Sequence, residues 1–216
     1  MSSIKACIFD LDGVIVDTVP AHYIAWKTIA NELGIPFDKT QNEQLKGVSR
    51  IKSMKKILAL GNVEMPEEEI KALTKKKNKI YVEIISKMTP ADILPGVEDF
   101  LLTLEANNIP KAIGSASRNT PTILKCVGLT NRFDAIVDGN VVSNSKPDPE
   151  VFLKGAELLG ASPADCVVLE DAISGVKAAK AGGMKCIGVG KPEILKQADL
   201  VIPDMTQLTL EKIQNL

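Results

Sequence analysis

The stretch Ala6-Cys7-Ile8-Phe9-Asp10-Leu11-Asp12-Gly13-Val14 decides the fold of this chain. Its first four residues are uniformly apolar, which predicts a strand buried on both faces, as in a parallel sheet. Parallel α/β sheets bind their ligands beyond the carboxyl ends of the strands. Asp10 and Asp12 come directly after the strand, so we expect them to lie in a functional site.

Similar apolar runs recur along the chain, with helical patterns between them. The runs cover residues 112–114, 135–137, 167–169, 186–189 and 200–202, and the helix candidates cover 97–107, 120–127, 149–159 and 174–181. Pro149 follows Asp148, which predicts a first-turn proline behind an N-cap. The repeated order of strand and helix predicts an α/β fold with a doubly wound, Rossmann-like parallel sheet and right-handed crossovers.

One segment, residues 17–89, lacks any strand pattern and contains helical stretches at 21–33 and 67–85. Pro20 and Thr89-Pro90 mark turns near its two ends. The segment carries 13 Lys and Arg against 9 Asp and Glu, whereas the whole chain has a net charge of −1. We therefore predict a basic helical cap domain at 17–89, inserted after the first strand of a catalytic core formed by 1–16 and 90–216.

The composition limits the class of protein. No apolar run approaches the roughly 20 residues of a membrane span, and the N-terminus lacks the apolar stretch of a signal peptide. Four cysteines stand far apart without a Cys-x-x-Cys pair, which favours reduced thiols in a cytoplasmic protein: Cys7, Cys126, Cys166 and Cys186. The near-zero net charge argues against nucleic-acid or membrane partners. We expect a monomer.

The two acids after the first strand point to chemistry. Extended backbone alternates its side chains, so Asp10 and Asp12 should face the same way while Leu11 turns inward. Two carboxylates so close repel each other unless a cation or a shared proton relieves them. An Asp-Gly turn would explain Gly13, but it would not explain two acids after a buried strand.

Three further polar groups follow later apolar runs. They are Ser115, Lys146 and the adjacent acids Glu170 and Asp171. Each has an ordinary explanation by itself: Ser115 as a turn former, Lys146 as a surface charge, and the two acids as the start of a helix. Because they occur in order and each follows a strand, we expect them to meet at one edge of the sheet.

These residues resemble the four motifs of the haloacid dehalogenase superfamily of phosphoryl-transfer enzymes. The matching residues are Asp10-x-Asp12-Gly13-Val14, Ser115, Lys146-Pro147 and Glu170-Asp171. The second aspartate indicates a phosphatase or phosphomutase, because the dehalogenases lack it. Within the superfamily, the sequence is similar to the β-phosphoglucomutase family at residues 42–50, 114–119 and 145–147, and at His22, Trp26 and Lys77-Asn78.

The resemblance implies a role for each matching residue. Asp10 would be the nucleophile and Asp12 the general acid/base, and Ser115 and Lys146 would stabilise the transferring phosphoryl group. Mg²⁺ would be held by Asp10, the backbone carbonyl of Asp12, Glu170 and Asp171. The implied substrate-binding residues come from both domains: His22, Trp26, Lys46, Gly47, Val48, Ser49, Arg50, Ser53, Lys77, Ser115, Ala116, Ser117, Arg118, Asn119 and Lys146.

The residue chemistry agrees with part of this assignment. Arg50 can grip a phosphate through two parallel hydrogen bonds, as a lysine cannot. His22 and Trp26 are four residues apart and share a helix face, so packing explains them as well as function does. Relatives often carry a hydroxyl residue where this chain has Ala172, which affects a hydrogen bond around the metal rather than the metal site itself.

The implied reaction converts β-D-glucose 1-phosphate to D-glucose 6-phosphate through β-D-glucose 1,6-bisphosphate. The sugar diphosphate would have to turn over between two half-reactions, because one Asp10 serves both ends. A sugar-phosphate phosphatase is the main alternative, because it shares every core residue and differs only in letting water intercept the aspartyl phosphate. A silent regulator that binds sugar phosphate would lack Asp10, Asp12 or Lys146, and all three are present.

Overall fold

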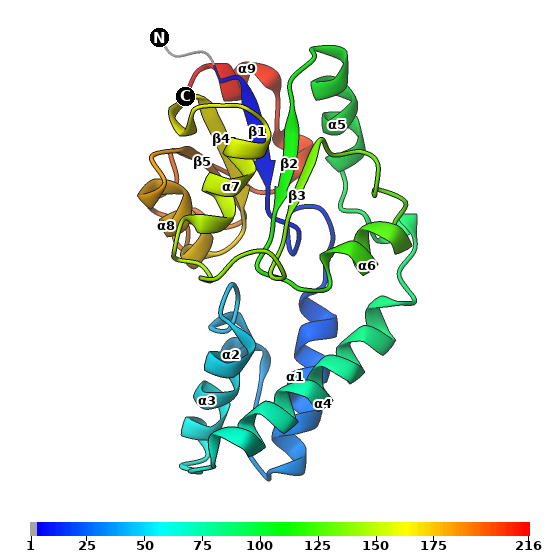
Figure 1. Cartoon of the computed structure of the whole chain (residues 1–216), viewed down its shortest axis with the longest axis vertical. Coiled ribbons are helices and arrows are strands. Elements are labelled where there is room, and N and C mark those ends of the chain that lie inside the picture. The colour runs from blue at the N-terminus through cyan, green and yellow to red at the C-terminus, as the bar shows by residue number, and fades with distance from the viewer. Residues whose placement is uncertain (1–3) are drawn as a thin grey trace.

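A computed structural model describes residues 4–216. A parallel sheet of six strands in the order β3-β2-β1-β4-β5-β6 forms its centre (Figure 1). At the carboxyl end of β1, Phe9 pairs with Ile113 of β2 and with Leu169 of β4, so these three strands end side by side. The strands are β1 Ala6–Phe9, β2 Lys111–Gly114, β3 Ala135–Val137, β4 Cys166–Glu170, β5 Lys185–Val189 and β6 Leu200–Ile202.

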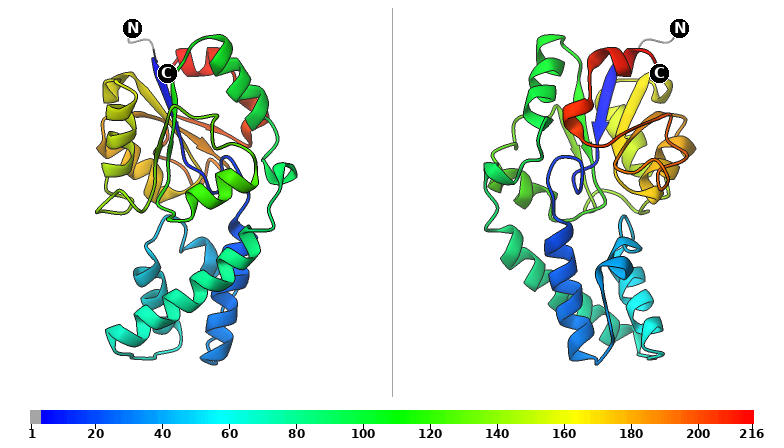
Figure 2. Two further views of the ribbon diagram at one scale, coloured as in Figure 1. Left: turned by 45° about the vertical axis from the view of Figure 1, so that its right-hand side comes forward. Right: turned by 180° about the vertical axis from the view of Figure 1, so that it is seen from behind.

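Helices cover both faces of the sheet, as predicted for a doubly wound fold (Figure 2). The side chains of β1 alternate: Cys7 and Phe9 join one hydrophobic cluster, whereas Ala6 and Ile8 join the other. The first cluster includes residues of α5 Val97–Ala106, α6 Thr120–Cys126 and α9 Leu210–Gln214, and the second includes residues of α7 Glu150–Leu158 and α8 Ile173–Ala181. Burial on both sides explains why the strands are apolar except at their ends, where Lys111, Glu170 and Lys185 lie.

The helix boundaries differ in detail from those predicted. The start of α7 lies one residue later than expected, because Pro149 is itself the N-cap and Asp148 Oδ1 accepts a hydrogen bond from the backbone nitrogen of Glu150 at 3.0 Å. The prediction that Pro149 sits in the first turn was therefore wrong by one residue. Three single-turn helices complete the unit: η1 Pro90–Asp92, η2 Pro163–Asp165 and η3 Met205–Gln207.

Four helices lie beyond the carboxyl edge of the sheet (Figures 1 and 2). They are α1 Val19–Glu32, α2 Lys39–Glu43, α3 Arg50–Leu60 and α4 Glu67–Ile85. Residues of all four elements or their connections pack into a separate hydrophobic cluster, which contains Trp26, Ile29, Met54 and Ile70. The chain leaves the sheet after β1, builds this cap and returns before α5, so the cap stands over the ends of β1, β2 and β4.

The cysteines are free: Cys7, Cys166 and Cys186 are buried, whereas Cys126 is only half-buried. Cys126 lies at the end of α6 and its thiol points to the backbone carbonyl of Ser86. Within residues 4–216, none of the helices is both long and apolar enough to cross a membrane.

Candidate active site

Asp10 and Asp12 line one pocket between the sheet and the cap, which encloses about 920 Å³ of empty space including its opening. Leu11 between them is fully buried, as the alternation of side chains predicted. Gly13 follows with a φ of +80°, and a Cβ there would lie 2.3 Å from Asp171 Oδ2. Glycine therefore allows both the tight turn and the close approach of Asp171 to Asp12's loop.

Lys146 joins two of the acids. Its Nζ lies 2.7 Å from Asp10 Oδ1 and 2.7 Å from Glu170 Oε1, and its side chain is 1% exposed. The second oxygen of Glu170 accepts a hydrogen bond from the backbone nitrogen of Ala172 at 2.6 Å. Burial lowers the pKa of Lys146, but the two carboxylates outweigh burial and raise it overall. Lys146 therefore holds a positive charge against Asp10, and Glu170 fixes its direction.

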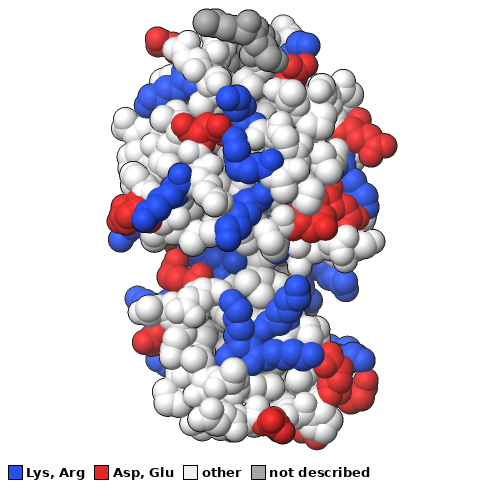
Figure 3. All heavy atoms as spheres, turned by 90° about the vertical axis from the view of Figure 1, so that its left-hand side faces the viewer, with Lys and Arg blue, Asp and Glu red and all other residues white. Residues whose placement is uncertain are grey.

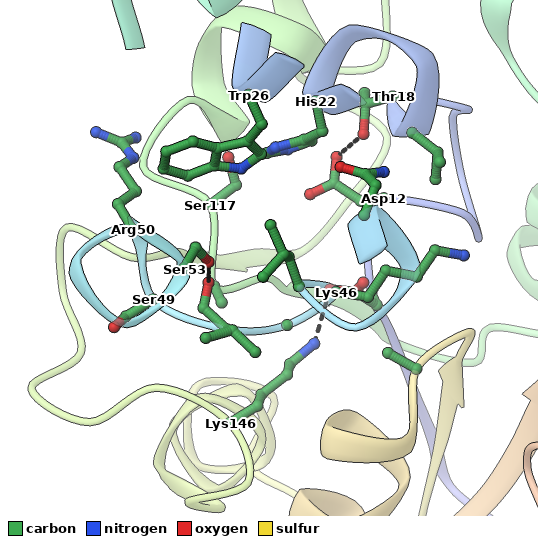
Figure 4. Close-up of a pocket in the computed structure, with 18 of the residues that line it drawn as sticks. Asp12, Thr18, His22, Trp26, Lys46, Ser49, Arg50, Ser53, Ser117 and Lys146 are labelled. Carbon is green, nitrogen blue, oxygen red and sulfur yellow. Dashed lines mark hydrogen bonds and ion pairs between the residues drawn. The ribbon is translucent and has the colours of Figure 1, made fainter. Parts of the chain in front are cut away.

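Asp12 has the environment of a proton shuttle. The hydroxyl of Thr18 donates a hydrogen bond to Asp12 Oδ1 (Figure 4). Burial raises the pKa of Asp12 to about 7, and the nearby Asp10 carboxylate adds to the effect. A carboxyl group with a pKa near neutrality can both give and take a proton at working pH.

The acids also form a candidate metal centre. Side-chain oxygens of Asp10, Glu170 and Asp171 all lie within 4.8 Å of one another. Burial raises the pKa of Asp171 to about 6, which Lys46 opposes and Asp10 reinforces. Mg²⁺ prefers carboxylate oxygens, and a dication would relieve the mutual repulsion of these groups. The donor set therefore fits the metal that the sequence implied.

The cap supplies basic and aromatic side chains to one wall of the pocket. Lys77 Nζ lies 2.9 Å from His22 Nδ1, 4.8 Å from the centre of the Trp26 ring and 4.4 Å from the centre of the Tyr81 ring. Burial lowers the pKa of Lys77 to about 7, and it lowers the pKa of His22 as well. His22 and Trp26 line the pocket together with Lys77.

The loop between α2 and α3, residues 44–49, closes another side of the pocket. Lys46 Nζ lies 3.0 Å from Asp171 Oδ2, which ties the cap to the core. Arg50 begins α3, and burial lowers its pKa, with Arg118 as a further cause. Figure 4 shows Arg50 and Asp12 on opposite sides of the pocket. An elongated anion with charge at both ends fits this separation of cationic and acid/base groups.

The loop after β2 forms the wall of the pocket that the core contributes. Asn119 Nδ2 donates a hydrogen bond of 3.0 Å to Asn78 Oδ1 of α4, and Ala116, Ser117 and Asn119 line the pocket. Ser115 is buried, and its hydroxyl accepts a hydrogen bond of 3.1 Å from the backbone nitrogen of Ser117.

Two of the predicted residues do not line the cavity. Ser115 is buried. Arg118 is exposed, and its Nε donates a hydrogen bond of 3.0 Å to the carbonyl of Gly139. The other predicted site residues all face the pocket: Asp10, Asp12, His22, Trp26, Lys46, Gly47, Val48, Ser49, Arg50, Ser53, Lys77, Ala116, Ser117, Asn119, Lys146, Glu170 and Asp171.

Sequence reasoning did not predict six of the lining residues as site residues: Thr18, Val19, Asn42, Leu45, Tyr81 and Ala172. Tyr81 follows Lys77 by four positions on α4, so the shared helix face was a usable signal. Its hydroxyl is buried and has no hydrogen-bond partner among residues 4–216. Thr18 carried no signal of its own, because its contact with Asp12 depends on how the chain turns after β1.

The outer surface is also charged. Figure 3 shows Lys and Arg side chains gathered along one face, over both the sheet domain and the cap. Asp and Glu side chains lie beside them on the same face, and the net charge of the whole chain is −1.

Comparisons with known proteins show which family and which relatives the chain is similar to. Residues 4–183 match the family model described as haloacid dehalogenase-like hydrolase. The chain is 46% identical to "Beta-phosphoglucomutase" of Bacillus subtilis (strain 168) over 209 residues. These aligned residues cover 96% of this chain and 92% of the relative. A crystal structure of β-phosphoglucomutase from Clostridium difficile has a TM-score of 0.93 and 43% identity, covering 98% of this chain and 96% of that one. The chain is also 31% identical to "Phosphorylated carbohydrates phosphatase" of Thermotoga maritima, over 85% of this chain and 83% of the relative.

Proposed function

Since this chain belongs to the haloacid dehalogenase-like hydrolase family, we propose that it acts as a β-phosphoglucomutase. The reaction is the interconversion of β-D-glucose 1-phosphate and D-glucose 6-phosphate, with β-D-glucose 1,6-bisphosphate as the intermediate. The enzyme is therefore an isomerase that moves a phosphoryl group between two positions of one sugar.

One observation carries the proposal: Asp10 and Asp12 face the same enclosed pocket as the cap loop that leads to Arg50. A mutase must bind one phosphate beside its nucleophile and the other phosphate at the far end of the sugar. Lys146 beside Asp10 and Arg50 across the pocket supply a cation at each end. The 46% identity to a β-phosphoglucomutase over almost the whole chain supports the same choice.

The chain's own residues account for the steps. Asp10 attacks phosphorus and becomes an aspartyl phosphate, while Lys146 offsets the negative charge that gathers there. Asp12 gives its proton to the departing sugar oxygen and takes a proton from the attacking hydroxyl in the next half-reaction. Arg50 holds the distal phosphate, and His22, Trp26 and Lys77 enclose the sugar. The closed cap keeps water from the aspartyl phosphate.

Asp10, the backbone carbonyl of Asp12, Glu170 and Asp171 would hold Mg²⁺. When bound, the ion supplies charge that stabilises the transferring phosphoryl group. The clustered side-chain oxygens of Asp10, Glu170 and Asp171 support this assignment.

The test is coupled detection of glucose 6-phosphate from β- and from α-D-glucose 1-phosphate, with inorganic phosphate followed in the same reaction. We expect glucose 6-phosphate from the β-anomer alone, with little free phosphate. Stoichiometric phosphate from either anomer, without glucose 6-phosphate, would contradict the proposal and identify a phosphatase.

A sugar-phosphate phosphatase is the second candidate, and the 31% identity to a carbohydrate phosphatase favours it specifically. That activity needs the same nucleophile and acid/base pair, and it differs only in admitting water. The cytoplasmic location and the monomeric state stay predictions from the sequence.

A further inference from the structure

Helix α8 contacts the loop between α2 and α3, residues 44–49, and this contact plays no part in the proposed chemistry. Ser174, in the first turn of α8, points its hydroxyl to the backbone carbonyl of Lys46 at 3.4 Å. Gly47 follows with a φ of +68°, and a Cβ there would lie only 2.1 Å from Ser174 Oγ. Gly47, the one glycine of the loop, therefore lies where the loop contacts the Ser174 hydroxyl.

The contact joins segments that lie 128 residues apart. In Figures 1 and 2 the loop between α2 and α3 is the part of the cap that reaches toward α8. The ion pair between Lys46 and Asp171 lies beside it. Lys46 therefore contacts the core through its ammonium and through its carbonyl, and Ser174 supports the second attachment.

The same loop shields the chemistry. Residues Lys46 to Arg50 line the pocket that contains Asp10 and Asp12. If the loop lifts, the pocket opens to solvent. Ser174 lies in the first turn of α8 and against Gly47, so its hydroxyl can limit how closely the loop approaches the core.

We propose that Ser174 is a positioning residue that holds the loop at residues 44–49 against the core. It thereby determines how often a sugar hydroxyl, rather than water, attacks the aspartyl phosphate. The inference rests on the proposed function, since it concerns the same phosphoenzyme. Attack by a sugar hydroxyl forms a P–O bond to the sugar, breaks the bond to Asp10 and gives the proton to Asp12. Attack by water forms a P–O bond to the water oxygen, breaks the same bond to Asp10, gives the proton to Asp12 and releases inorganic phosphate. Both routes restore the Asp10 carboxylate.

Ser174→Ala removes the hydroxyl and keeps the helix. We expect the ratio of inorganic phosphate to glucose 6-phosphate to rise about 2- to 10-fold, in line with the loss of one hydrogen bond. Lys177→Ala, an exposed change one turn further along α8, should leave the ratio at the wild-type value. An unchanged ratio in Ser174→Ala would overturn the proposal.

A double-mutant cycle tests the contact itself. Gly47→Ala should open the cap, because the new Cβ meets Ser174 Oγ and because φ is positive there. Adding Ser174→Ala should relieve part of this defect, because the serine Cβ lies at a tolerable 3.3 Å from the new methyl group. Strictly additive effects of the two changes would show that the residues do not act on each other.

Opening can be measured without turnover. Trp26 is the single tryptophan, lines the pocket and is 3% exposed, so quenching of its fluorescence by acrylamide reports access of solvent to the pocket. Quenching should increase in Ser174→Ala and Gly47→Ala and return toward wild type in the double variant. If the wild-type protein formed no glucose 6-phosphate, the proposed mutase activity would be contradicted, whereas the quenching series would still decide whether Ser174 holds the loop against the core.

Discussion

Lys146 Nζ lies 2.7 Å from Asp10 Oδ1, in a pocket where the lysine side chain is almost completely buried. The pair brings together two residues 136 positions apart, one after β1 and one before α7. The ammonium faces the carboxylate that would attack phosphorus, so the same charge can neutralise the carboxylate at rest and the phosphoryl group during transfer.

Lys146→Met should impair both stability and turnover. Removing the ammonium leaves Asp10 and Glu170 as buried carboxylates without their partner, which typically costs about 3–5 kcal/mol of the free energy of unfolding. Turnover should fall about 10²- to 10³-fold, as when one preorganised charge donor is removed. Urea unfolding and steady-state assays measure the two effects. Lys125→Met, an exposed change on α6, is the control and should alter neither.

Asp12→Asn should separate the two halves of the chemistry. The variant should still accept a phosphoryl group from acetyl phosphate, whose leaving group needs little protonation. Its turnover of sugar phosphates should drop about 10²- to 10⁴-fold, because the acid/base group is lost. Radiolabelled phosphoenzyme and glucose 6-phosphate report the two reactions. Equal loss of both reactions would remove the acid/base role from Asp12, and Asp10→Asn should lose both.

The raised pKa of Asp12 also predicts a pH dependence of stability. Its folded pKa of about 7 lies above the ordinary value of 3.8, so the folded state retains the proton more firmly than the unfolded state. The resulting stabilisation is complete below about pH 4 and is lost as the pH rises to about 7. In metal-free buffer, the stability of the wild type relative to Asp12→Asn should therefore decline across this window. A constant difference would show that Asp12 titrates normally. Glu64→Gln, an exposed change, serves as control.

Arg50→Lys should weaken sugar-phosphate turnover about 10-fold or more although the charge is kept, because a lysine cannot bind a phosphate bidentately. Phosphorylation by acetyl phosphate should change little, since that donor has no distal phosphate. Similar losses with both donors would assign Arg50 to the chemistry at Asp10 or to folding. Arg132→Lys, which changes a surface ion pair with Glu105, provides the matched control.

Mg²⁺ should stabilise the folded protein. Exhaustive chelation should abolish turnover but leave the fold intact, because the hydrophobic clusters do not depend on the acids. At 100 times its dissociation constant, the ion should add about 2.7 kcal/mol to the free energy of unfolding. Melting temperature measures the gain, which Asp171→Asn should lose and Glu64→Gln should keep. Full activity after chelation would contradict the metal requirement.

Much of the fold could be predicted from local sequence. The strand at residues 6–9 was predicted with its observed bounds, because a strand buried on both faces is apolar throughout. The strands at 135–137 and 200–202, which are only partly buried, were also predicted with their observed bounds. The helix at 67–85 was also predicted with its observed bounds. Asp10 and Asp12 predicted a functional site, because polar residues directly after such strands lie at the carboxyl edge of the sheet.

Tertiary structure alone decided which of these groups meet and how. Lys46 reaches Asp171 across 125 positions, and Tyr81 reaches the pocket because α4 packs beside α1. Ser115 and Arg118 belong to a promising motif, yet the turn after β2 buries the first and directs the second to the carbonyl of Gly139. Periodicity reports which face of an element is apolar. Contacts between distant segments depend on how the cap packs onto the core, and no local pattern records that packing.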